Sequence, residues 1–264
     1  MRRTVKGPIL FFCLATFLPG CATSPVERGL DTPSVHEDPY ADERAVGEEI
    51  NREILSQFYP YTDPNVVKYV NDLGDDLASH AKRENIAYKF TILYDQKIYA
   101  TSAPGGYIYV TTGMLNFLQN EAELAAVLAH EVARQQYKDP RFTTKNQEMI
   151  NAAAQAGTAI APMFGPFGSL AALGIVLLHA YSQGSQKTPD QMLIESDRNA
   201  MEYLLDSGYD PQALMDVLER FLKAGEQVLP LFYDYYQSRP ITEERMQGIK
   251  KNFQKLSLGE IRLR

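Results

Sequence analysis

His130 and Glu131 are the residues of this sequence whose types and spacing best suit metal-dependent hydrolysis. They begin the segment HEVAR, inside an alanine-rich, apolar run. In the pattern HExxH, two histidines one helical turn apart bind zinc and the glutamate activates a water molecule. Here the position four residues after His130 is Arg134. Because arginine keeps its proton and offers no lone pair to a metal, the sequence predicts only half of such a site.

The run from Asn120 to Pro140 is predicted to form one amphipathic helix that carries these residues. Asn120 is placed to cap it, and Glu123 is placed to reach back to the Asn120 amide as in a capping box. Apolar side chains recur along the run at helical spacing, at Leu124, Val127, Leu128 and Val132. This spacing predicts a helix at the centre of the core.

Periodicity and capping signals predict further elements around this helix. Helices are expected over 40–58, 63–81, 188–208, 210–224 and 242–256, and strands over 88–94 and 107–112. The expected fold class is therefore α+β, mostly helical with a small β-sheet. A long apolar stretch at 149–182 is interrupted by prolines and glycines before any run reaches the ~18 residues of a membrane span. For this stretch we favour helices packed on the core over membrane insertion.

The first 20 residues have the composition of a secretory signal. Basic residues precede an apolar run without acids, and the run ends in LPGC at Cys21. This ending resembles a bacterial lipobox, in which the cysteine is lipidated and becomes the mature N-terminus. A plain signal peptide and a short membrane anchor are the alternatives. The run is too short to span a bilayer comfortably, and a cysteine directly after a small residue favours lipidation. We expect a signal peptide at 1–20, a tether at 21–39 and one domain at 40–264.

Charge and cysteine content narrow the class of partner and the location. The net charge of −7 and the lack of a basic run make nucleic acid a poor partner. Cys13 lies in the leader and Cys21 is the expected acylation site, so no disulfide is expected. Ala22 stands where an inner-membrane retention aspartate would follow the cysteine in enterobacterial lipoproteins. We expect a protein of the bacterial cell envelope, anchored by lipid on Cys21, at the outer membrane and facing the periplasm.

Four segments of the chain carry a resemblance to one family. They are Ala103–Asn116, the helix with HEVAR, Glu195–Gln212 and Ser238–Met246. In this order they resemble the gluzincin-type zinc metallopeptidases of peptidase family M48, which includes bacterial envelope lipoprotein peptidases. The resemblance covers about residues 40–256. It implies a zincin-like fold, an endopeptidase ancestry and zinc as the family cofactor.

The resemblance assigns roles to individual residues. His130 matches the first zinc-binding histidine, Glu131 the catalytic base and Asp197 the aspartate that orients a ligand histidine. The family's glutamate ligand stands four residues before that aspartate, where this chain has Leu193. Envelope members often carry one more histidine where this chain has Arg239.

These departures imply a degenerate site. We expect no tightly bound zinc, and Glu131 is then a vestigial base because no Lewis acid assists it. His130 is expected as a core histidine that is hydrogen-bonded to Asp197. We hypothesise that Arg134, together with Arg239, replaces the metal electrostatically by pairing with Glu131 or Asp197.

Three functions fit the sequence. The one that we favour is a pseudopeptidase that binds peptides, envelope protein clients or an active paralogue in envelope protein quality control. The strand at 107–112 is its expected binding edge, because strand addition needs backbone groups and no metal. The second is an active zinc metalloendopeptidase that degrades misfolded envelope proteins, with Glu195 or His179 completing the site. The third is a structural lipoprotein.

Overall fold

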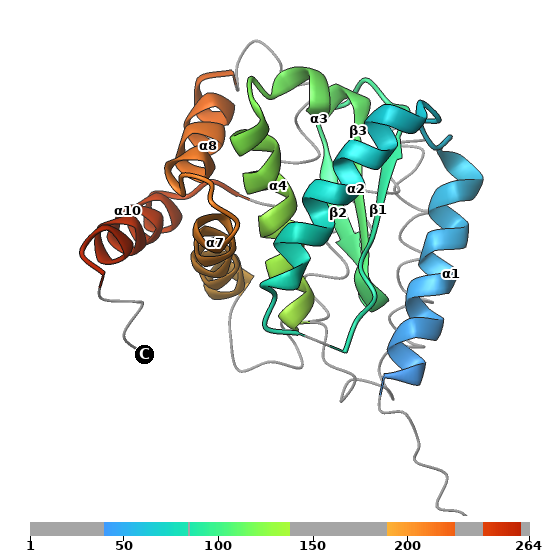
Figure 1. Ribbon diagram of the computed structural model, residues 1–264, viewed down its shortest axis with the longest axis horizontal. Helices are drawn as coiled ribbons and strands as arrows, with labels where there is room; N and C mark the ends of the chain where they lie inside the picture. Colours follow the sequence, from blue (N-terminus) through green and yellow to red (C-terminus); the bar gives the residue numbers. More distant parts are fainter. Residues whose placement is uncertain (1–39, 84, 138–188, 225–239, 260–264) are drawn as a thin grey trace, which may run out of the picture. The chain divides into compact units, whose positions relative to one another are not determined.

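The computed structural model describes residues 40–83, 85–137, 189–224 and 240–259, all within one compact unit, Asp38–Arg264 (Figure 1). Helices dominate and one small sheet is present, which confirms the expected mostly helical α+β class. The described helices are α1 (Ala41–Gln57), α2 (Pro64–Ser79), α3 (Thr112–Phe117), α4 (Glu121–Arg134), α7 (Pro189–Asp206), α8 (Gln212–Ala224) and α10 (Glu243–Ser257). The strands are β1 (Lys89–Leu93), β2 (Ala100–Ala103) and β3 (Tyr107–Thr111), and the short 3₁₀ turns are η1 (Pro104–Gly106) and η2 (Gln135–Tyr137).

The sheet has the strand order β1-β3-β2, so β3 is its central strand. β3 pairs in parallel with β1, where Ile92 lies opposite Val110, and antiparallel with β2, where Ser102 lies opposite Ile108. The prediction that strand 107–112 offers a free edge was therefore wrong, because its backbone is hydrogen-bonded on both sides. β2 was not predicted at all, because the four small residues ATSA carry little strand signal.

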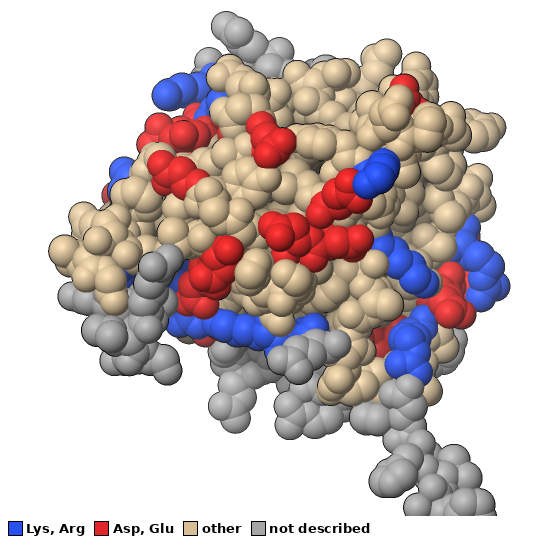
Figure 2. All heavy atoms as spheres, in the orientation of Figure 1, with Lys and Arg blue, Asp and Glu red and all other residues tan. Residues whose placement is uncertain are grey.

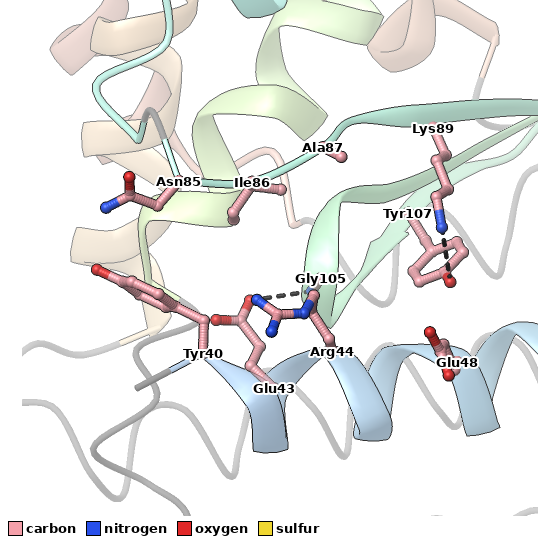
Figure 3. A pocket seen from close by; sticks show the side chains of 10 residues that line it. All are labelled: Tyr40, Glu43, Arg44, Glu48, Asn85, Ile86, Ala87, Lys89, Gly105 and Tyr107. Carbon is pink, nitrogen blue, oxygen red and sulfur yellow. Dashed lines mark hydrogen bonds between the residues drawn. The ribbon is translucent and has the colours of Figure 1, made fainter. Parts of the chain in front are cut away.

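Helix α1 holds the turn between β2 and β3. Gly105 in this turn has a φ of 77°, a left-handed conformation that favours glycine. Its amide donates to Glu43 Oε1 on α1 over 2.9 Å, as Figure 3 shows. Arg83 pairs with the same carboxylate and donates to the Gln135 carbonyl over 2.7 Å. Gly47 allows the close approach of α1, since a Cβ there would lie 2.0 Å from a carbonyl oxygen of the turn.

Helix α4 occupies the centre of the described fold, as the sequence predicted. It packs against α2, α7, α8 and β2 (Figure 1), and every side chain from Glu123 to Arg134 is buried. The helix ends at Arg134 and the 3₁₀ turn follows, so the predicted extension to Pro140 was too long within the described residues. The Gln135 side chain explains part of this ending, because its amide donates to the Ala103 carbonyl over 2.9 Å.

The N-terminus of α4 is capped by Asn120, as predicted. Its Oδ1 accepts from the Glu123 amide over 2.9 Å. The Glu123 carboxylate accepts from the Gln119 amide over 2.8 Å, whereas the capping box predicted the Asn120 amide. The reason is that the same carboxylate turns toward α8 and pairs with both terminal nitrogens of Arg220. The cap therefore also joins α4 to α8.

Other predicted helix ends are confirmed by their local contacts. Asp63 caps α2 by accepting from the Asn65 amide over 2.9 Å, and Thr242 caps α10 by accepting from the Arg245 amide over 3.1 Å. Gly208 follows α7 with a φ of 81°. Within the described part of the chain, none of the helices has the length and apolar character needed to cross a bilayer. The leader and the apolar stretch at 149–182 lie outside that part.

Candidate functional site

The packing of α4 against α7 brings His130 beside Asp197. The His130 Nδ1 lies 2.8 Å from Asp197 Oδ1, and both side chains are almost completely buried. The sequence predicted a hydrogen bond between this histidine and Asp197, and the distance places the two groups within reach of one. Burial lowers the pKa of His130 and the nearby Asp197 opposes this only in part, so the imidazole is neutral at pH 7. Its Nε2 has no hydrogen-bond partner among the described residues.

Asp197 is held from its other side by Arg245 of α10. The Arg245 Nε donates to Asp197 Oδ2 over 2.7 Å, and Nη2 donates to Oδ1 over 2.9 Å. Burial alone raises the pKa of Asp197, but the charge and hydrogen bonds of Arg245 more than reverse this, so the pKa lies well below its usual range. Sequence reasoning missed Arg245, although it lies in the segment RPITEER that carried the resemblance. The available signal was that a buried aspartate requires a cation.

Glu131 pairs with Arg134 in the buried interior. Its Oε2 lies 3.3 Å from Arg134 Nη1 and accepts from Ser102 Oγ of β2 over 2.9 Å. Glu131 is fully buried and Arg134 is 8% exposed. The structure thus contains the hypothesised pair of Arg134 with Glu131. The cation on Asp197 is Arg245, and Arg239 lies outside the described residues.

Comparison with known proteins agrees with this geometry. Residues 64–252 match the model of Peptidase family M48. The chain belongs to peptidase family M48. The match includes α4, α7 and most of α10, the three helices that supply His130, Asp197 and Arg245.

Similar curated proteins come from bacteria and from a plant. The "Beta-barrel assembly-enhancing protease" of Escherichia coli (strain K12) is 27% identical over 201 residues, which are 75% of this chain and 39% of that protein. The protein of the same name in Yersinia pestis is 26% identical over 195 residues, 70% of this chain and 39% of that protein. The "Mitochondrial metalloendopeptidase OMA1" of Arabidopsis thaliana is 28% identical over 169 residues, 64% of this chain and 32% of that protein. The chain thus spans about two-fifths or less of the length of these relatives.

The described residues at this M48 site do not supply the ligands that the family's zinc ion needs. A zinc site needs at least three nitrogen, sulfur or oxygen ligands. His130 Nε2 is one suitable donor, but Arg134 brings a fixed positive charge one helical turn away. Leu193, one turn before Asp197 on α7, is 1% exposed and offers only hydrocarbon. Among the described residues, no three His, Cys, Asp or Glu side chains form a group that could hold a metal.

Two residues that were considered as replacement ligands do not complete the site within the described structure. Glu195 is half-buried on α7 and belongs to no group of three described side chains that could hold a metal. His179 lies outside the described residues, as do His36 and Cys21. His80 ends α2 as its C-terminal cap residue.

Proposed function

We propose that this M48 chain is a pseudopeptidase, a protein that keeps the metallopeptidase fold but works by binding peptide or protein clients in the cell envelope. The observation that carries the proposal is the buried pair of Glu131 with Arg134. In an active member the catalytic glutamate serves a metal-bound water. Here its carboxylate faces a guanidinium at the position of a zinc ligand, and the third ligand position is Leu193.

The client class is suggested by the relatives. The name of the E. coli relative describes it as a protease that enhances β-barrel assembly. We extend the envelope setting to this chain and infer that its clients are unfolded or partly assembled envelope proteins, or an active paralogue. The acidic side chains on one face of the domain favour protein clients over nucleic acid. Figure 2 shows a band of acidic side chains over α2, where Asp72, Asp75 and Asp76 are exposed.

A client segment could pair as an extra strand with β2, which lies beside the site at one edge of the sheet. It could not pair with β3, which is the central strand. The Ser102 hydroxyl of β2 donates a hydrogen bond to Glu131, and the Ala103 carbonyl already accepts one from the Gln135 side chain. The remaining part of this edge is short, and all four residues of β2 are buried. Client binding by strand addition therefore requires β2 to become uncovered.

Zinc content is the first test of the proposal. The full chain, purified after growth with zinc, is expected to hold far less than one zinc per chain by elemental mass spectrometry. It is also expected to bind fluorescently labelled, unfolded casein without cleaving it. About one zinc per chain, together with casein cleavage that Glu131→Gln abolishes, would establish the rival function of an active zinc endopeptidase. The Nε2 of His130, which has no hydrogen-bond partner among the described residues, favours this rival.

The envelope location depends on the expected lipid anchor at Cys21. When the chain is expressed in bacteria with radiolabelled palmitate, the wild-type protein is expected to take up label and Cys21→Ser to lose it. Cys13→Ser is the matched control, because Cys13 lies in the leader that is expected to be removed, and this variant is expected to keep the label. Equal labelling of all three proteins would contradict the lipid anchor.

A further inference from the structure

The two changed ligand positions have a combined effect on charge. A Zn²⁺ ion and one carboxylate ligand together carry one net positive charge, and a histidine ligand is neutral. Arg134 and Leu193 together also carry one net positive charge. The histidine, the glutamate and the zinc ion of the family are thus replaced by a pair of residues of the same total charge.

The rest of the buried site is arranged around this charge. Glu131 and Asp197 are each completely buried, and each carboxylate meets one guanidinium, from Arg134 at 3.3 Å and from Arg245 at 2.7 Å. Among the described residues, the charges of these four side chains therefore sum to zero without any metal. Buried carboxylates require such compensation, because an uncompensated charge in the interior is strongly destabilising.

The groups that orient the metal-facing histidine are also intact. Arg245 fixes Asp197 with two hydrogen bonds, and Asp197 lies 2.8 Å from His130 Nδ1. The opposite ring nitrogen, Nε2, is buried and has no hydrogen-bond partner among the described residues. The structure thus keeps the orientation of one ligand histidine although two ligand positions are changed.

We propose that the Arg134 guanidinium is a built-in cation that takes the structural place of the family's zinc ion, so that the fold is independent of metal supply. This inference rests on the proposed pseudopeptidase function, and it adds two consequences. First, the loss of Tm on removing the Arg134 charge depends on whether Glu131 is charged. Restoring both changed ligands together returns the site to zinc dependence, because the histidine is still held in place.

The first consequence is tested by a double-mutant cycle on the full chain. Arg134→Met removes the charge and keeps most of the stem, and it is expected to lower Tm by roughly 10 °C. In the background of Glu131→Gln, which has no charge to compensate, the same substitution is expected to lower Tm by less than about half as much. Arg134→Lys, which keeps the charge, is expected to retain most of the wild-type Tm. An equal loss of Tm in both backgrounds would overturn the role of Arg134 as a cation.

The second consequence is tested with zinc alone as the probe. Arg134→His with Leu193→Glu is expected to hold about one zinc per chain, and its Tm is expected to fall with a chelator and to recover with zinc. Leu193→Glu alone is the matched control, which is expected to bind no zinc. A folded double variant, shown by its circular dichroism, with no more zinc than the control would overturn the inference that the orienting groups are intact.

The two proposals fail in different ways. One zinc per wild-type chain contradicts the pseudopeptidase function itself. A zinc-free wild-type chain whose Arg134→Met and Glu131→Gln effects are additive contradicts only the role of Arg134.

Discussion

Replacing Arg245 with methionine is expected to lower the free energy of unfolding by about 3–5 kcal/mol. The substitution leaves the Asp197 carboxylate, which has no solvent exposure, without the guanidinium that donates to both of its oxygens. Burial lowers the pKa of the neighbouring His130, which disfavours the imidazolium form that could take the place of the guanidinium. Equilibrium urea unfolding of the full chain, followed by circular dichroism, measures the effect.

The same experiment separates the ion pair from the packing of the arginine. Arg245→Met combined with Asp197→Asn is expected to recover part of the loss, because no buried charge then remains uncompensated. Arg198→Met is the matched control on the neighbouring position of α7, where the side chain is 43% exposed and lies 3.7 Å from Glu202. Its expected cost is below about 1 kcal/mol. If Arg245→Met costs no more than this control, Asp197 does not depend on Arg245.

Replacing Glu43 with alanine is expected to lower the free energy of unfolding by about 3 kcal/mol. The carboxylate is 4% exposed, the Arg83 side chain with which it pairs is 13% exposed, and the Gly105 amide is a second donor to it. Its loss leaves a largely buried guanidinium without its carboxylate and releases the turn between β2 and β3. Urea unfolding measures the stability, and amide hydrogen exchange at Gly105 measures the turn.

Glu48 provides the control for this prediction, because it lies on the same helix and is exposed. Glu48→Ala is expected to change the stability by no more than about 0.5 kcal/mol and to leave the exchange at Gly105 unaltered. An unchanged exchange rate at Gly105 in Glu43→Ala would show that the turn is held by its own glycines and not by α1.

The local features of this fold were predictable because their signals act over a few residues. Asn120, Asp63 and Thr242 cap the helices that follow them, since a side-chain oxygen reaches an amide two or three residues ahead. The apolar spacing in α4 predicted its burial in the same way. Local signals did not predict the strand β2, because its four small residues form a strand only through pairing with β3.

Residue type alone decided which side chains at the site could bind zinc. It did not decide which side chains pair with the buried carboxylates. That Arg134 and Leu193 cannot bind zinc is a property of a guanidinium and a hydrocarbon, and it holds in any fold. The pairing of Asp197 with Arg245 joins residues 48 positions apart and depends on how α10 packs on α7. The same is true of Glu123, whose local cap was predicted but whose partner Arg220 lies 97 positions away.

By itself, then, the sequence determined the long helices, the family resemblance and the residue types at the family's ligand positions, because propensity, capping and ligand chemistry belong to single side chains and their near neighbours. Only the tertiary structure decided that β3 is central, that α4 ends at Arg134, and that each buried carboxylate meets its own arginine. Those outcomes depend on long-range packing, in which every buried charge and backbone group must find a partner wherever the fold places one.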